Sequence, residues 1–250
     1  MHDPRNKEID ARDVERNALG GSPAAAAPRL VWDLPVRVMH WLLALAVAGA
    51  WLSHYDLTDW FFFHAMCGYV ILVVTITRIV WGIVGTHHAR FANFVRGPRF
   101  VIRYLVDRGN AQSTVGHNPV GALMVLLLLA LLLAQATTGL FANDQIANVG
   151  PLFGYIRTVT SDKLTGVHRV LANVIVTCVC LHIAAVLAHY VFKRENLILP
   201  MVTGRKPPES VPQNLAIANS RLRIAAAIAA IVIALLALII YSAPEASLSF

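Results

Sequence analysis

Charge is what this chain has least of. Only 14% of its 250 residues are charged, where soluble domains carry about 25%, and 57% are hydrophobic. A water-soluble domain of this length cannot bury so much apolar surface. The apolar residues form long runs instead of alternating with polar ones, as the strands of a membrane β-barrel would require. The composition therefore excludes a soluble domain and predicts an all-α integral membrane protein.

Cysteine is also scarce, and its placement is restrictive. The three cysteines, Cys67, Cys178 and Cys180, all lie inside apolar runs, which argues against a disulfide framework. No C-x-x-C-H motif occurs, so covalent attachment of haem is excluded. Residues 1–29 contain no long apolar core, and we expect them to form a flexible cytoplasmic tail rather than a cleavable signal peptide.

Five apolar segments are long enough to cross about 30 Å of hydrocarbon as helices. They cover about residues 34–54, 61–84, 120–141, 165–192 and 222–243. The first four predict a four-helix transmembrane domain over residues 30–206. Residues 207–250 are then expected to supply a linker and a fifth transmembrane helix.

Basic residues collect on one side of the predicted membrane. Eighteen of the 21 lysines and arginines lie in the tail, between spans two and three, or after span four, and only Arg157, Lys163 and Arg169 lie on the opposite side. The positive-inside rule then places the N-terminus and the loops 85–119 and 193–221 in the cytoplasm, and the C-terminus outside. The net charge of +7 therefore reports how the chain is oriented in the membrane. Membrane lipid is an expected partner, and nucleic acid is not.

Four histidines lie within apolar spans, where a polar side chain needs a partner. They are His40, His64, His168 and His182. His168 and His182 are fourteen residues apart on span four, so their side chains point within about 40° of each other and lie about 21 Å apart along the helix. One helix so arranged can ligate two stacked haems, one near each membrane face.

Each haem iron would take its second axial histidine from a facing helix at the same depth. The direction of the spans puts His40 and His182 near the cytoplasmic face, and His64 and His168 near the outer face. Ligation by two histidines leaves no open position on the iron, which favours electron transfer over oxygen binding. We therefore expect two non-covalent b haems, with these four histidines as the metal ligands.

Several alternatives remain open. His54 also lies fourteen residues after His40, but it stands among polar residues where the chain leaves the membrane, so His64 is preferred. The four histidines could instead serve a transporter or proton channel without haem. Arg37, one turn before His40, could pair with a haem propionate or simply extend toward the interface.

Further residues are expected around the haems. Gly68 and Gly139 could let a porphyrin approach the backbone, and Asp33 is expected to cap the first helix. Arg78, at the cytoplasmic end of span two, is a candidate cofactor-binding residue on the same side of the membrane as residues 196–206.

Several segments resemble the bacterial cytochrome b561 family, which includes the b-type cytochrome subunits of membrane-bound nickel–iron hydrogenases. The segments are VWDLPVRVMHW at 31–41, HAMCGY at 64–69, RIVWG at 78–82, VHR at 167–169 with His182, and the tract 193–206. The resemblance covers residues 31–206 and implies two b haems held by one histidine from each of spans one and two and two from span four. It supports His64 over His54 and leaves the fifth span outside the shared pattern.

The expected function is therefore that of a diheme b-type cytochrome, either a separate electron-transfer protein or a subunit of an oxidoreductase. The resemblance implies electron exchange between the membrane quinone pool and a redox partner such as a c-type cytochrome, a dehydrogenase or a hydrogenase. An alternative is a stand-alone superoxide:quinone oxidoreductase, in which the outer cations Arg157, Lys163 and Arg169 would attract the anion.

Overall fold

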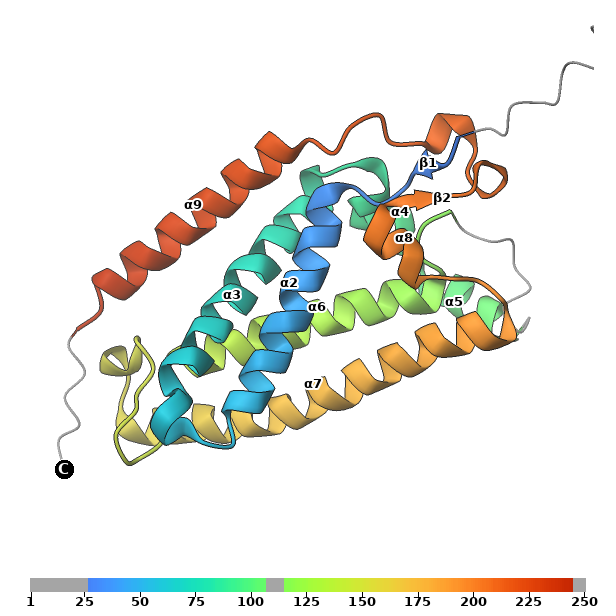
Figure 1. Ribbon diagram of the computed structural model, residues 1–250. Helices are drawn as coiled ribbons and strands as arrows, with labels where there is room; N and C mark the ends of the chain where they lie inside the picture. Colours follow the sequence, from blue (N-terminus) through green and yellow to red (C-terminus); the bar gives the residue numbers. More distant parts are fainter. Residues whose placement is uncertain (1–26, 107–114, 245–250) are drawn as a thin grey trace, which may run out of the picture.

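A computed structural model describes residues 27–106 and 115–244, with residues 58 and 105 described by their backbone alone. Five long helices dominate the molecule (Figure 1). They are α2 (Leu34–Ser53), α3 (Leu57–Val84), α6 (Pro119–Leu140), α7 (Thr158–Phe192) and α9 (Leu222–Tyr241). All five are long and apolar enough to cross a membrane, which confirms the predicted all-α membrane fold. The predicted tail lies outside the described residues except for its last three.

Two helices begin earlier than predicted. Both α3 and α7 start in polar residues that precede their apolar runs, because helical hydrogen bonding does not require apolar side chains. The Asp56 side chain accepts a hydrogen bond from the backbone N–H of Asp59 and starts α3 at Leu57. In α7 the additional turns contain the polar Ser161 and Asp162.

Asp33 starts α2 as predicted and also ties it to the end of α3. Its carboxylate accepts the N–H of Val36 at 2.7 Å, and the indole N–H of Trp81 at 3.0 Å. It also accepts the hydroxyl of Thr86. Asp33 is 1% exposed, so these three bonds replace the water that the carboxylate loses on burial.

The helices pack as a chain of neighbours. α2 lies on α3, α3 on α6, and α6 on α7, while α9 packs on the outside of α3 and α2 (Figure 1). In contrast, α7 makes only sparse contacts with α2 and α3. Only 6% of the most apolar stretch of α7 is buried, against 50% in α3. α7 is therefore packed only loosely against the two helices that face it.

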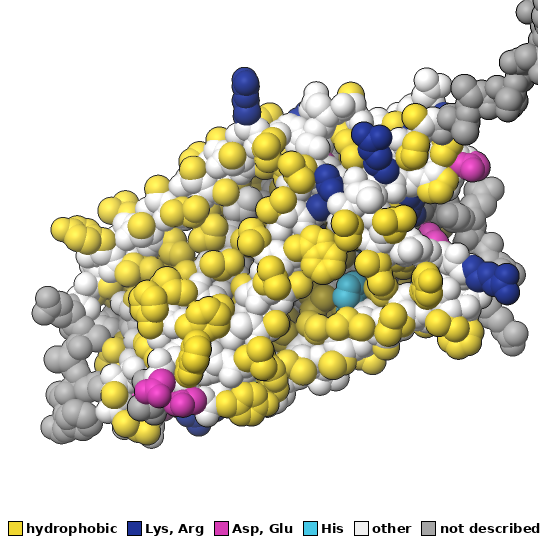
Figure 2. Space-filling model, in the orientation of Figure 1, with side chains coloured by type: hydrophobic (Ala, Val, Ile, Leu, Met, Phe, Trp, Pro, Cys, Tyr) yellow, Lys and Arg dark blue, Asp and Glu magenta, His cyan; other side chains and the backbone are white. Residues whose placement is uncertain are grey.

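Short segments close one end of the bundle, and we call this end the cap. It contains η1 (His87–Ala89), α4 (Phe91–Phe94), α5 (Pro98–Val106), α8 (Ile198–Thr203), η3 (Pro208–Ser210) and η4 (Gln213–Leu215), and the strands β1 (Arg29–Leu30) and β2 (Arg205–Lys206). β1 and β2 pair antiparallel, which joins the start of α2 to the chain that follows α7. Most of the basic side chains visible in Figure 2 lie toward this end, while the flank of the bundle is largely apolar.

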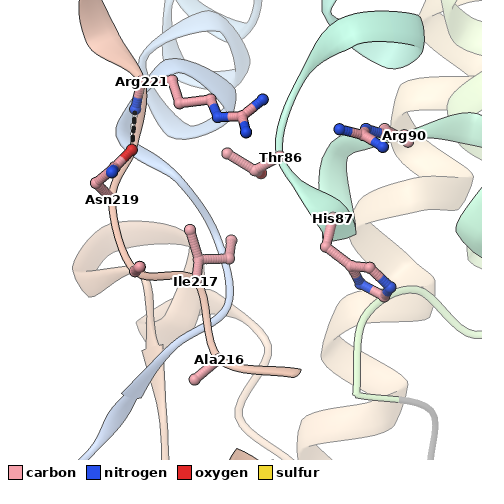
Figure 3. A pocket seen from close by; sticks show the side chains of 8 residues that line it. Thr86, His87, Arg90, Ala216, Ile217, Asn219 and Arg221 are labelled. Carbon is pink, nitrogen blue, oxygen red and sulfur yellow. Dashed lines mark hydrogen bonds between the residues drawn. The ribbon is translucent and has the colours of Figure 1, made fainter. Parts of the chain in front are cut away.

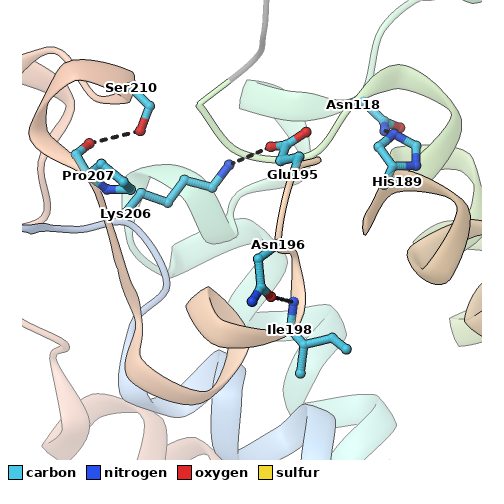
Figure 4. A network of polar contacts seen from close by, with 8 residues as sticks. All are labelled: Asn118, His189, Glu195, Asn196, Ile198, Lys206, Pro207 and Ser210. Carbon is cyan, nitrogen blue, oxygen red and sulfur yellow. Dashed lines mark hydrogen bonds and ion pairs between the residues drawn. The ribbon is translucent and has the colours of Figure 1, made fainter. Parts of the chain in front are cut away.

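Polar contacts bind the cap to the helix ends (Figure 4). Lys206 in β2 pairs with Glu195 at 3.4 Å. The amide of Asn118, which caps α6, lies 3.2 Å from Nε2 of His189 in the last turn of α7. The cap therefore fixes the ends of α6 and α7 to each other and to the start of α2.

Candidate haem-binding sites

The four histidines singled out from the sequence meet in two pairs. The ring centres of His40 on α2 and His182 on α7 are 6.4 Å apart. Those of His64 on α3 and His168 on α7 are 6.3 Å apart. Two imidazoles on opposite sides of one metal ion, each bonded at about 2.0–2.1 Å, have their ring centres about 6 Å apart. Both pairs are therefore spaced as the two axial ligands of one metal ion would be.

The side chains of the two histidine pairs are not enclosed on all sides. All four rings are only partly buried. Figure 2 shows a histidine at the bottom of a hollow in the apolar face, over the space between α2 and α7. A Cβ atom built on Gly68, one turn after His64, would meet nothing within 4 Å. Gly68 therefore leaves open space one turn from His64.

In the His64/His168 pair, both rings are oriented through their Nδ1 atoms. Nδ1 of His64 lies 3.0 Å from the carbonyl oxygen of Ala50, and Nδ1 of His168 lies 2.9 Å from that of Gln135. An Nδ1–H that donates to a carbonyl leaves the lone pair on Nε2 for a metal. This arrangement is typical of histidines that ligate metal ions.

Residues of α6 lie close behind His168. A Cβ atom on Gly139 would come within 2.9 Å of Cε1 of His168, so Gly139 makes room for the ligand ring itself rather than for a porphyrin. The side-chain nitrogen of Gln135 lies 3.1 Å from Nε2 of His168, at the position a metal would take. The Oε1 atom of Gln135 is buried without a hydrogen-bond partner among the described residues. Binding of a metal here requires the Gln135 side chain to turn away.

The His40/His182 pair lies closer to the cap. Nδ1 of His40 is buried and has no hydrogen-bond partner in the part of the chain that the structure describes. Nearby, the guanidinium of Arg37 donates to the carbonyl oxygen of Val202 in α8, while its Nε is buried and also lacks a partner. Arg37 therefore holds the cap against α2, and one of its donors remains available.

Buried cations gather at the cap end of the bundle. Arg78 is 6% exposed, lies 5.2 Å from the centre of the Phe91 ring, and has an Nη1 atom without a hydrogen-bond partner in the described structure. Lys206 is 7% exposed and pairs with the more exposed Glu195. The buried carboxylate of Asp33 attracts Arg78 from the start of α2. Each of the two buried cations therefore has one carboxylate near it, and Nη1 of Arg78 is the donor that an anionic ligand could still bind.

Two histidines at the cap are held neutral. Burial, together with the positive charges of Arg78 and Lys206, lowers the pKa of His117 to about 3. Its ring packs against Trp32 and Phe94, with both pairs of ring centres 4.6 Å apart. Burial also lowers the pKa of His88. Neither histidine therefore adds positive charge to the cluster at neutral pH.

The sequence did not single out His117 or Gln135. His117 lies two residues before α6 and reads as a loop residue, because the aromatic rings that bury it come from distant segments. Gln135 was detectable as an amide inside an apolar run. His54, the rival of His64, is exposed and stacks on Tyr55, with ring centres 4.0 Å apart.

The donor set of each pair would suit a haem. Among the described residues, no group of three or more His, Cys, Asp or Glu side chains could hold a metal ion. Metal sites built from protein alone usually use three or four such ligands. A porphyrin supplies four nitrogens of its own, so two facing histidines complete its coordination. The residues present therefore fit two haems.

Comparison with known proteins identifies the family of the chain. The profile described as prokaryotic cytochrome b561 matches residues 31–204. The chain is 26% identical over 209 residues to a probable Ni/Fe-hydrogenase B-type cytochrome subunit of Rhizobium leguminosarum bv. viciae, covering 70% of this chain and 87% of the relative. A probable subunit of the same kind from Bradyrhizobium diazoefficiens is 24% identical over 220 residues, covering 74% and 89%.

A third relative is the probable Ni/Fe-hydrogenase 1 B-type cytochrome subunit of Escherichia coli K12, 25% identical over 208 residues, covering 70% of this chain and 88% of the relative. No solved structure matches the chain. The family match begins at the start of α2, ends in the cap and leaves α9 outside. The chain therefore belongs to the prokaryotic cytochrome b561 family, whose members are membrane b-type cytochromes of electron transfer.

Proposed function

We propose that this protein is a diheme b-type cytochrome that moves electrons between the membrane quinone pool and a redox partner. One b haem would be held by His40 and His182, and the other by His64 and His168. The observation that carries this proposal is the spacing of the two pairs, with ring centres 6.4 and 6.3 Å apart and both pairs completed by α7. When bound, the haems supply reversible one-electron oxidation and reduction.

The protein's own residues orient and insulate the ligands. The carbonyl groups of Ala50 and Gln135 fix the rings of His64 and His168. The apolar side chains around the four rings exclude water, which is one of the means by which a protein sets a haem potential. In this proposal residues 30–206 form the diheme domain, and residues 207–250 add the linker and α9.

The charges at the cap fit the propionates of the haem held by His40 and His182. Arg78 and Lys206 are the buried cations on that side, and each propionate would bring one negative charge. Arg37 is a further candidate through its available Nε. We place the quinone site at the same end, near Arg78 and residues 196–206.

The partner and the orientation follow from less specific features. The relatives are named as subunits of nickel–iron hydrogenases, which supports a hydrogenase or another dehydrogenase as the redox partner. The concentration of basic residues in the cap places it in the cytoplasm of a bacterial plasma membrane, by the positive-inside rule. The C-terminus would then lie outside, together with the ends of α2 and α6.

The test is the reduction of the protein by a quinol. The purified protein in lipid vesicles is mixed anaerobically with a quinol, and its haem absorption is followed over time. We expect reduction, and we expect Arg78→Gln to slow it about tenfold, the effect of losing one charge-assisted hydrogen bond. Arg103→Gln, on exposed α5, serves as the matched control and should change nothing. A haem-loaded protein that superoxide reduces and quinol does not would instead support the superoxide reading.

A further inference from the structure

A cavity of about 310 Å³ lies at the cap, apart from the histidine pairs (Figure 3). One wall is formed by Thr86, His87 and Arg90, which follow the end of α3. The other wall is formed by residues 216–221, which lead into α9. The cavity therefore separates the four-helix bundle from the approach to the fifth helix.

The charged residues that line this cavity are all cations. Arg90 and Arg221 face it from opposite walls, with His87 below them in Figure 3. No Asp or Glu lines the cavity among the described residues. The carboxylate of Asp33 lies behind Thr86 and accepts a hydrogen bond from the hydroxyl of Thr86. Two guanidinium groups converging without a carboxylate between them form a site for a phosphate or a similar anion.

The side chain of Arg90 is held in place by a bond that leaves donors free, and the backbone of Arg221 is fixed next to the cavity. Nε of Arg90 donates to the carbonyl oxygen of Gly85 at 2.9 Å, which leaves its terminal nitrogens for a ligand. The backbone N–H of Arg221, rather than its side chain, bonds to Asn219 at 3.2 Å (Figure 3). The backbone of Arg221 adopts a left-handed conformation, with φ of 47°. Such a conformation is uncommon for a residue other than glycine and is often found at binding sites.

The cavity lies at the ends of two candidate membrane spans. The spans α3 and α9 end at Val84 and begin at Leu222, directly beside the two walls. Exposed apolar side chains follow on the membrane side, since Ile83 is 68% exposed and Ile224 is 49% exposed. A ligand with an anionic head and apolar chains would contact both regions at once.

We propose that this cavity binds the phosphate of an anionic phospholipid, whose acyl chains lie along the exposed apolar surface of α3 and α9. The lipid would connect the bundle to the fifth helix. This site is independent of the haems, because none of the four histidines lines it.

The test counts bound lipids on the full-length protein. Delipidated protein in detergent is incubated with phosphatidylglycerol or with phosphatidylcholine, and lipid adducts are counted by native mass spectrometry. We expect phosphatidylglycerol to be retained in preference, and Arg221→Gln to weaken its binding about tenfold, the effect of losing one guanidinium–phosphate contact. Arg223→Gln removes the same charge from the same helix outside the cavity and should leave binding unchanged.

Arg90→Gln should weaken the binding of phosphatidylglycerol to a similar extent. Equal retention of the two lipids, or equal losses from Arg221→Gln and Arg223→Gln, would overturn the proposal. Complete displacement of phosphatidylglycerol by inorganic phosphate at millimolar concentration would identify free phosphate as the ligand and would also overturn it.

Discussion

The carbonyl oxygen of Ala50 lies 3.0 Å from Nδ1 of His64 and holds the ring toward α7. His54, by contrast, stacks on aromatic rings at the exposed end of α2. We therefore predict that His64→Ala removes one of two haems, whereas His54→Ala retains both. Haem per protein, measured on the purified variants, distinguishes the two. Loss of haem from His54→Ala alone would reverse the assignment.

Stability should depend on pH through the buried histidines of the cap. The pKa of His117 falls from 6.5 to about 3 on burial, so the unfolded chain binds more protons than the folded protein between these values. The stability that depends on a neutral His117 is fully present above pH 6.5 and is lost as the pH falls toward 3. The free energy of unfolding should then fall by up to about 1.4 kcal/mol per pH unit for one such proton.

Two variants check this pH dependence through thermal unfolding in detergent between pH 7 and pH 4. His117→Leu should reduce the slope of the unfolding free energy against pH. A remainder of this slope should come from His88, because burial also lowers the pKa of His88. The second variant, His88→Leu, should remove that remainder and leave the contribution of His117. An unchanged slope in His117→Leu would show that His117 is not the titrating group.

At the scale of elements, the cap depends on the end of α8. Gly204 has φ of 81°, and a Cβ atom there would lie 2.7 Å from the carbonyl oxygen of Trp32. Its own carbonyl oxygen accepts the N–H groups of Val31 and Trp32 at 2.8 and 3.0 Å. We predict that Gly204→Ala destabilises the protein by about 1–3 kcal/mol.

The comparison for this variant is Gly97→Ala, where a Cβ atom would meet nothing within 4 Å. Thermal unfolding of the two variants side by side measures the difference. Equal stability of Gly204→Ala and Gly97→Ala would mean that the contact with the start of α2 does not hold the cap.

The elements differ in how far the sequence predicts them. The spans follow from apolar runs, and the shared face of His168 and His182 follows from helix geometry, because both depend on residues close in sequence. Two other features cannot be predicted from the sequence, because they depend on segments far apart in the chain. These are the pairing of Arg29 with Lys206 and the burial of His117. The obstruction by Gln135 also escapes the sequence, because it depends on how α6 packs against α7.

At the scale of the whole molecule, α9 lies outside the histidine pairs. It packs on α3 and α2, whereas the proposed haems lie on the side of α7. We predict that a chain ending at Ser220, which keeps the hydrogen bond from Ile217 to Leu30, retains both haems. Haem content and thermal stability of the shortened protein test this. Loss of a haem would place α9 within the haem domain.

The apolar composition gains a specific meaning at this scale. The helices surround a space beside α7 that two histidine pairs span, so much of the hydrophobic material would insulate two redox centres from water and lipid.

The most direct test of this account is a reduced-minus-oxidised spectrum of the purified full-length protein, combined with a haem count per chain. We predict a b-type spectrum and two haems per chain. A colourless protein would contradict the cytochrome assignment, and a single haem per chain would contradict the two-pair arrangement on α7.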